Sequence, residues 1–344
     1  MTAIAAAVAE AFAIWPTVPR TSEEETFGTV DPSAIDRLVS TFCEEHLGSA
    51  ATACLLFESH QTSVFGLELR DGRRVCVKVF GPRYGRAFLD AVQFVQGRLV
   101  ERGFPCPRPL LGARPLGGGS ALVETLELEG DWADAHRPEI RSRIAEALAR
   151  LIALTTDLGV ADRVGDLPRS MLEVAVSPWP RPHHPMFDFA ATASTAGWID
   201  ELGRRARRRV TSAGGRDVVG HGDWSVKDMR FDGDRLAVVY DWQSLCRAPE
   251  AVLVGQAAGS FTMQWRFPAP IAPDVDAIEG FIDAYERARG RPFVAEERGT
   301  ARAAAAFVLA YSARCEHALD PGAVEFPPRS ARDAVRSFGG ILVT

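Results

Sequence analysis

Closely spaced cysteines are missing from this sequence. Its six cysteines lie singly along 344 residues, and no Cys-x-x-Cys pair occurs among them. This arrangement argues against a structural zinc site and against the disulfide framework of a small secreted domain. A reducing, cytoplasmic location is therefore expected.

Long apolar runs are missing as well. No run approaches the roughly 18 residues that a helix needs to cross a bilayer, so we expect no membrane partner. The alanine-rich start, residues 1–15, contains Glu10 and lacks a basic segment. It is therefore predicted to form a short helix rather than a signal peptide.

An excess of basic charge is the third absence. The chain has 39 Lys and Arg residues against 45 Asp and Glu, a net charge of −6, which disfavours a nucleic-acid partner. The basic cluster at residues 204–209 is more typical of the solvated face of a helix than of an anion site. The acidic balance suits a cationic substrate, although many cytosolic proteins share it.

The sequence does contain ample material for a core. It is 47% hydrophobic and long enough for two domains or one bilobal unit. Asp31 precedes an apolar periodic stretch and is a predicted helix N-cap. Apolar spacing predicts helices within residues 1–47 and at 86–102, 141–158, 248–265 and 300–319.

Strand signals cluster between the first two helical regions. Antiparallel strands are predicted at residues 54–57, 64–69 and 74–80, the last two joined by an Asp71-Gly72 hairpin turn. A further strand is predicted at 121–126. The proline-rich segment 177–185 is a predicted loop, whose two histidines are more typically exposed than bound to a metal.

Carboxylates follow two short apolar runs in the second half of the chain. Val218-Val219 leads into the sequence His221-Gly222-Asp223, and Asp228 stands five residues after Asp223. Strand signals flank a turn at residues 232–234, and the second strand ends at Asp241. This hairpin should bring Asp241 back beside Asp223.

Phosphoryl transfer explains such a spacing. The chemistry needs a base that orients the acceptor hydroxyl and oxygen ligands for Mg²⁺ on the nucleotide phosphates. In a kinase, an oxygen ligand follows the base Asp by five residues and a further Asp lies on the next strand. Asp223 is thus the candidate base, and Asp228 and Asp241 are the candidate metal ligands. The alternative is a tight turn with solvent-exposed acids. It would require the order of the motif residues, their spacing and both flanking strands to coincide by chance.

This segment resembles the His-Gly-Asp-x-x-x-x-Asn motif and the following metal-binding Asp of the aminoglycoside phosphotransferase family. The resemblance implies an α+β, bilobal protein-kinase-like fold. It would have a helical N-terminal extension (residues 1–47), a small antiparallel β-rich N-lobe that binds the nucleotide (48–127) and a larger, mainly helical C-lobe that holds the catalytic loop and the acceptor (128–344).

The resemblance also assigns roles in the first half of the chain. Lys78, within a predicted strand, would contact the α and β phosphates, with a solvated edge-strand lysine as the alternative. An acid on the helix at 86–102 would pair with Lys78, and Asp90 is the candidate, with Gln93 competing and surface exposure equally expected. Backbone groups from Glu124 to Leu126 would bind the purine edge.

Two departures from the family pattern stand out. Position 228 is Asp where the family usually has Asn; a carboxylate still suits a hard cation but adds charge beside the base. The segment 58–63 has no glycine where the family often has a glycine-containing nucleotide loop. Hydroxyls such as that of Ser63, or backbone amides, would have to meet the phosphates, and a plain hairpin turn is the alternative.

Further residues near these motifs have open interpretations. His221 is expected to brace the loop rather than transfer protons. Lys227 is interpreted either as neutralising the moving phosphoryl or as exposed. Glu250 and Glu316 could face an acceptor, but cap and surface roles are favoured.

The sequence therefore predicts an enzyme: an O-phosphotransferase that moves the γ-phosphoryl of ATP or GTP, with Mg²⁺, to a hydroxyl of an aminoglycoside-like or other antibiotic. One alternative is a metabolic kinase for a sugar, a choline-like amine or an amino alcohol. Another is a nucleotide-binding pseudokinase without catalysis, motivated by Asp228 and the missing loop glycine. No nucleic-acid partner is expected in any of the three.

Overall fold

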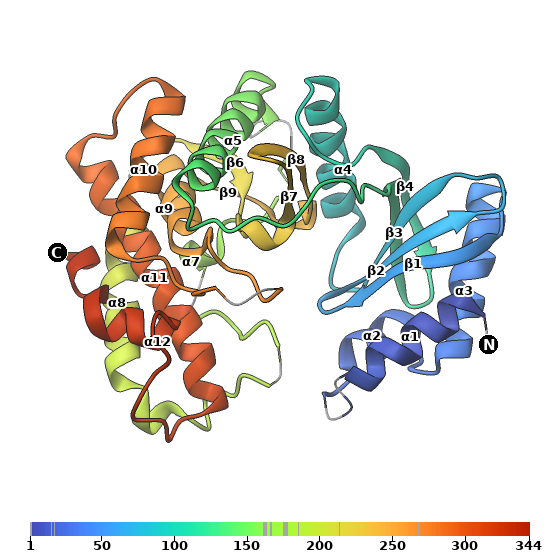
Figure 1. The fold of residues 1–344 in the computed structure, drawn as a ribbon, viewed down its shortest axis with the longest axis horizontal. Coiled ribbons are helices and arrows are strands. Elements are labelled where there is room, and N and C mark those ends of the chain that lie inside the picture. Colours follow the sequence, from blue (N-terminus) through green and yellow to red (C-terminus); the bar gives the residue numbers. More distant parts are fainter. Residues whose placement is uncertain are drawn as a thin grey trace. The chain divides into compact units, whose positions relative to one another are not determined.

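The computed structural model describes residues 2–14, 16, 18–160, 164–165, 167–174, 178–184, 186–212, 214–266 and 269–344. The chain forms two compact units (Figure 1). The first comprises Met1–Val100 and Pro107–Leu128, and the second comprises Glu101–Cys106 and Glu129–Thr344. Among the described residues, no helix has both the length and the apolar character needed to cross a membrane.

The first unit is a five-stranded antiparallel sheet with helices on both faces. Its strands follow the order β1-β2-β3-β5-β4. They are β1 (Ala51–Ser59), β2 (Thr62–Leu69), β3 (Arg74–Phe80), β4 (Pro109–Leu116) and β5 (Gly119–Thr125). The helices are α1 (Ala3–Ile14), α2 (Thr21–Phe27), α3 (Pro32–Phe42) with its π-helical continuation η1 (Cys43–Leu47), and α4 (Arg86–Glu101).

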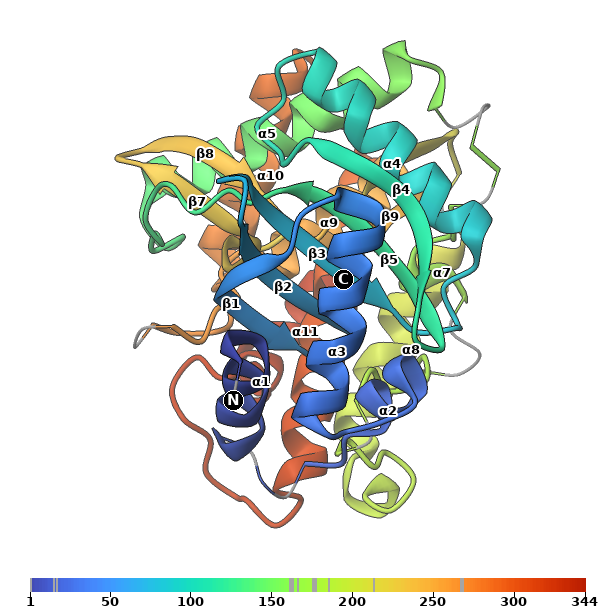
Figure 2. The ribbon, with the colours of Figure 1, turned by 90° about the vertical axis from the view of Figure 1, so that its right-hand side faces the viewer.

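Alternation along the strands divides the side chains between two cores. Val77 and Val79 of β3 belong to the main core, which contains apolar residues of α1 and α3, and Figure 2 shows α3 lying across this face. Phe80 packs with Leu89 of α4 in a second, smaller core. Because successive side chains in a strand point to opposite faces, Lys78 shares the α4 side with Phe80.

The local signals of the first unit are confirmed, with one strand missed. Asp31 caps α3 by accepting from the amides of Ser33 and Ala34, and Gly72 adopts a φ of 86° in the β2–β3 turn. The missed strand is β4, at the edge of the sheet. It contains Pro109 and Pro115, which only edge strands readily accept because proline has no N–H for a ladder.

The second unit is mainly helical and carries two small sheets. Its strands pair β6 (Asp217–His221) with β9 (Leu245–Pro249) and β7 (Met229–Asp232) with β8 (Arg235–Val239). Its helices are α5 (Pro138–Asp157), α7 (Met171–Val174), α8 (Gly197–Thr211), α9 (Glu250–Ser260), α10 (Val275–Arg289), α11 (Ala295–Leu319) and α12 (Ala331–Ala334). Short 3-10 or π turns are η2 (Ala193–Thr195), η3 (Val226–Asp228), η4 (Trp242–Ser244), η5 (Val335–Gly339) and η6 (Ile341–Val343).

The helices predicted for this unit are present, with altered bounds. The predicted helix at 248–265 is α9, which begins only after β9, since Pro249 ends the strand. The basic cluster lies on α8, whose apolar side is buried and whose arginines are mostly exposed, as expected. The described part of the proline-rich loop, residues 178–184, has no helix or strand; Ser177 and Pro185, like Met1 and Trp15 of the first predicted helix, lie outside the described residues.

Small residues let α9 and α11 approach closely (Figure 1). A Cβ at Gly255 would overlap the Ala301 carbonyl, and one at Gly259 would lie 2.8 Å from the Ala305 carbonyl oxygen. The alanine-rich sequence of α11 therefore serves a contact that larger side chains would push apart.

This contact gives a stability prediction. Gly255→Ala should lower the free energy of unfolding by about 1–3 kcal/mol, because overpacking outweighs the better helix propensity of alanine. Gly97→Ala in α4 is the matched control: its Cβ would meet no atom within 4 Å, so the change should raise stability by about 0.5–1 kcal/mol. Urea unfolding of the three proteins measures both effects, and a neutral Gly255→Ala would contradict the close approach.

Candidate active site

The His221-Gly222-Asp223 motif begins at the last residue of β6 and is held by its backbone. The Gly222 amide donates to the Ser244 carbonyl at 2.7 Å, and the Gly222 carbonyl accepts from the side chain of Gln256. A Cβ at position 222 would lie 3.0 Å from Cys246 Sγ and 3.2 Å from the Ser244 oxygen. Glycine suits this position, because a larger residue would crowd the end of η4 and the start of β9.

The loop and the following hairpin gather the three predicted aspartates. One carboxylate oxygen each from Asp223, Asp228 and Asp241 lies within 4.8 Å of the other two. Asp228 ends the 3-10 turn η3, and its carbonyl accepts from the Tyr240 amide at 2.8 Å. The β7–β8 hairpin thus returns the chain to the loop, as predicted. Three convergent carboxylates form the donor set that a hard divalent cation prefers.

Asp241 has an unusual backbone conformation. Its φ of 65° and ψ of 39° place it in the left-handed region, which Asp tolerates better than most residues and which is common at functional sites. Its carboxylate accepts from the Ser244 hydroxyl at 2.6 Å and from the Gln243 amide. These two partners, which the sequence pattern did not reveal, fix the orientation of the carboxylate.

Lys227 lies among these acids. Its Nζ is 2.6 Å from Asp223 Oδ2, 2.8 Å from Asp228 Oδ2 and 3.1 Å from Ser225 Oγ. The side chain is only 19% exposed, so exposure, one of its two interpretations, is wrong. Lys227 offsets part of the repulsion between the carboxylates.

The pKa values of Asp223 and Asp228 are shifted in opposite directions. Burial would raise the pKa of Asp223, but the ammonium of Lys227 holds it below its ordinary value. Burial raises the pKa of Asp228 to about 7, and the carboxylates of Asp241 and Asp223 add to this effect. Asp223 is therefore the more readily ionised of the two, which suits a base that must accept a proton.

His221 braces the loop, as predicted. Its Nδ1 accepts from the Asp223 amide at 3.2 Å, its Nε2 lies 3.3 Å from the Tyr240 carbonyl oxygen, and its ring packs edge-on against Trp224 and Trp242. Burial lowers the pKa of the imidazole. A neutral ring with the proton on Nε2 satisfies both hydrogen bonds.

In the first unit, the predicted pairing of Lys78 with Asp90 is wrong. Lys78 Nζ lies 2.6 Å from Glu124 Oε1, and both side chains are 8% exposed. Asp90 instead pairs with Arg86 one helical turn away, at 3.2 Å on the exposed side of α4. The competing residue, Gln93, donates to the Leu111 carbonyl. The acid comes from β5 because β5 is the neighbour of β3 in the sheet.

Other predicted nucleotide contacts stay predictions. The buried Ser63 of β2 has its hydroxyl 2.9 Å from that of its strand partner Ser59 in β1, and the two-residue turn between these strands has no glycine. The Leu126 amide donates to the Arg74 carbonyl at 3.4 Å, so this amide already has a partner within the sheet.

The structure places two further glutamates and two histidines that the sequence analysis singled out in the second unit. Glu316 accepts from the first amides of α12, and Glu250 accepts from the Tyr285 hydroxyl and pairs with Arg289. The cap role is thus confirmed for Glu316, whereas Glu250 is a partly buried ion-pair partner rather than a cap or a surface residue. In the proline-rich loop His183 is exposed and His184 half-buried.

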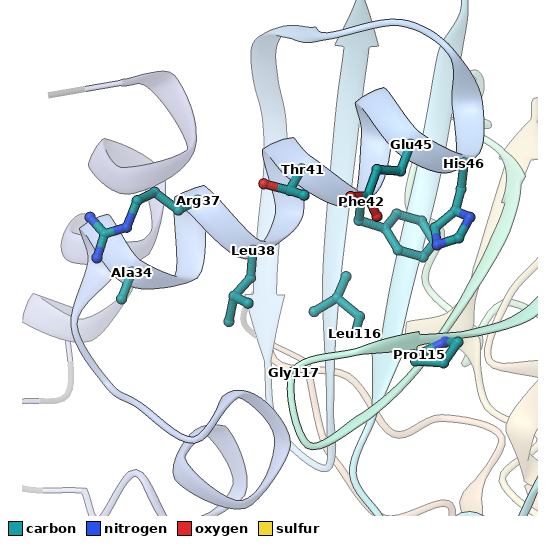
Figure 3. A pocket seen from close by; sticks show the side chains of 10 residues that line it. All are labelled: Ala34, Arg37, Leu38, Thr41, Phe42, Glu45, His46, Pro115, Leu116 and Gly117. Atoms are coloured by element: carbon teal, nitrogen blue, oxygen red, sulfur yellow. The ribbon is translucent and has the colours of Figure 1, made fainter.

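A cavity in the first unit is separate from these residues. It measures about 430 Å³ and lies between α3 and the β4–β5 turn, lined by residues such as Leu38, Phe42, His46 and Leu116 (Figure 3). Phe42 and Leu116 belong to the main core, whereas Lys78 and Glu124 lie on the other face of the sheet.

Comparison with known proteins supports the fold. No protein-family model and no curated protein sequence matches the chain. An amicoumacin kinase solved with AMP-PNP, Ca²⁺ and Ami is 10% identical, with a TM-score of 0.56 over 84% of this chain and 87% of that one. A choline/ethanolamine kinase family protein from Mesorhizobium loti is 14% identical, with a TM-score of 0.55 over 90% and 94%.

A third solved structure is a spectinomycin phosphotransferase in complex with ADP and spectinomycin. It is 11% identical, with a TM-score of 0.54 over 89% of this chain and 97% of that one. Together these similarities confirm the α+β, bilobal, kinase-like fold that the family resemblance implied.

The position of Lys227 gives a prediction about cation binding. Two unit charges 4 Å apart interact by about 4 kcal/mol at an effective dielectric constant of 20, and solvent at the half-exposed Asp223 reduces this. Lys227→Met should therefore tighten Mg²⁺ or Mn²⁺ binding by on the order of tenfold, and Asp228→Asn should weaken it similarly. The double variant should return close to the parent affinity.

Calorimetric titration with Mn²⁺ alone measures these affinities without any nucleotide. Lys227→Arg is the matched control, because it keeps the positive charge. Weaker cation binding in Lys227→Met would contradict the view that the lysine opposes a cation at this cluster.

Proposed function

We propose that the protein is an O-phosphotransferase that moves the γ-phosphoryl of ATP or GTP to a hydroxyl group of a small molecule. One observation carries the proposal: Asp223, Asp228 and Asp241 converge within 4.8 Å on a kinase-like fold. The fold itself hosts many acceptors and does not decide among them.

Each residue of the site has a role in this reaction. Asp223 accepts the hydroxyl proton as the acceptor oxygen bonds to the γ-phosphorus and the bond from that phosphorus to the bridging oxygen breaks. Lys227 holds Asp223 ionised and oriented before the acceptor arrives. Asp228 and Asp241 are the proposed ligands of Mg²⁺, which when bound would screen the phosphate charges. Lys78 would contact the phosphates from β3.

The acceptor is proposed to be an antibiotic hydroxyl. Two enzymes that are similar to this chain in fold, the amicoumacin kinase and the spectinomycin phosphotransferase, are named for an antibiotic substrate. The choline/ethanolamine kinase family protein supports the metabolic alternative to a similar degree. Transfer assays with labelled ATP or GTP and a panel of aminoglycosides, spectinomycin, macrolides, sugars and choline distinguish the two. Nucleotide binding without transfer to any of these acceptors would favour the third alternative, a nucleotide-binding pseudokinase.

The base assignment predicts a separation of turnover from binding. Asp223→Asn should lower kcat by about 10²- to 10⁴-fold, the usual contribution of general base catalysis, while nucleotide affinity stays within a few-fold. Asp241→Asn should weaken binding of the metal–nucleotide complex by about tenfold or more, because a charged ligand is lost. Steady-state kinetics and nucleotide titrations give both numbers. Unchanged turnover in Asp223→Asn would remove Asp223 from the base role.

The antibiotic hypothesis has its own test in cells. Expression in a sensitive bacterium should raise the inhibitory concentration of at least one drug class, and Asp223→Asn should abolish the increase. If neither protein protects against any class, the metabolic alternative gains support.

A further inference from the structure

The environment of Lys78 is unusual for a lysine in a sheet. Its side chain is 8% exposed in the middle of β3, where an unpaired ammonium would be costly. Glu124 supplies the compensating charge from the adjacent strand β5, at 2.6 Å. In the ladder Glu124 lies opposite Cys76, two residues before Lys78, so the two side chains meet diagonally on one face of the sheet.

A third buried residue orients the carboxylate. Gln96 of α4 is 2% exposed, and its Nε2 donates to Glu124 Oε2 and to the Pro107 carbonyl, both at 2.8 Å. The two oxygens of Glu124 are therefore divided, with Oε1 on Lys78 and Oε2 on Gln96. A buried ion pair is tolerated only when such additional hydrogen bonds satisfy its atoms.

The helix contributes an amide where the sequence predicted a carboxylate. Asp90, the acid early in α4, is exposed and bound to Arg86. The charge and its orientation thus come from two elements: β5 carries the acid, and α4 carries the neutral Gln96. The separation of Lys78 and Glu124 is set by the register of neighbouring strands rather than by the placement of a helix.

We propose that Glu124 is the residue that positions Lys78 for the nucleotide phosphates, and that Gln96 holds Glu124 in place from α4. The role of Lys78 rests on the function proposed above. The Lys78–Glu124–Gln96 network is a positioning device: Lys78 touches the phosphates, whereas Glu124 and Gln96 act through it.

The first test measures nucleotide binding by titration with a fluorescent ATP analogue and Mg²⁺. Glu124→Gln and Lys78→Met should each weaken binding about tenfold, and the double variant should be no weaker than either single one, because residues that act as a unit are not additive. Glu68→Gln is the matched control, since Glu68 pairs with Arg74 in the same sheet on an exposed surface. Additive losses, or an unchanged affinity in Glu124→Gln, would overturn the proposal.

The second test moves the acid. The exchange variant Glu124→Gln/Gln96→Glu keeps one carboxylate and one amide in the network and transfers the acid to α4. It should recover at least fivefold of the affinity lost in Glu124→Gln, a rescue that a purely structural role does not predict. If Glu124→Gln does not fold, the exchange variant and Lys78→Met/Glu124→Gln, which leaves no unpaired charge, carry the comparison. A loss in Asp90→Asn equal to that in Glu124→Gln would return the positioning role to the helix.

The outcomes separate this inference from the proposed function. A parent protein that binds no nucleotide and transfers no phosphoryl group contradicts the function. A parent that does both, with Glu124→Gln unaffected in nucleotide KM and in kcat, contradicts only the role of Glu124. An increase in KM larger than the decrease in kcat is the expected result, because the lysine contacts the nucleotide before and during transfer.

Discussion

Repulsion between like charges is the constraint around which the second unit is built. Three carboxylates within 4.8 Å of one another would move apart on a flexible loop. The chain prevents this by bonding Gly222 to Ser244 of η4, by bonding Tyr240, after the β7–β8 hairpin, to Asp228, and by holding Asp241 in a left-handed conformation. The ammonium of Lys227 removes part of the remaining repulsion. Rigid backbone and a local counter-ion together hold the three carboxylates close to one another.

In the first unit the buried charge is positive rather than negative, and a fixed backbone together with an opposite charge again stabilises it. There a single buried ammonium, that of Lys78, needs an anion, and the sheet supplies it from the next strand. In both units a lysine and a carboxylate are fixed by backbone that cannot easily shift: strand register in one case, a loop braced by His221 in the other. Such preorganisation is what phosphoryl transfer demands, since positioning and charge account for most of its catalysis.

The sequence predicted those features that depend on local spacing. The order and separation of Asp223, Asp228 and Asp241 gave their convergence, because a tight hairpin leaves the chain little freedom. The sequence did not predict contacts whose partner residue comes from a distant strand or helix. Glu124 is 46 residues beyond Lys78 (124 less 78), and only the strand order β3-β5 makes them neighbours. The strand β4 was not predicted because it contains prolines, which are rare in most strands.

Lys227 and Asp228 are best understood together, because the lysine pairs with the carboxylate that departs from the family pattern. The resemblance expects Asn at 228, and a carboxylate there adds one negative charge beside the base. Lys227, the preceding residue, adds one positive charge and bonds the carboxylates of both Asp228 and Asp223. The net charge around the cation position is therefore the same as with Asn and no lysine contact. A partly buried carboxylate at 228 would be costly without such a partner, so the lysine contact explains how the fold tolerates the added charge.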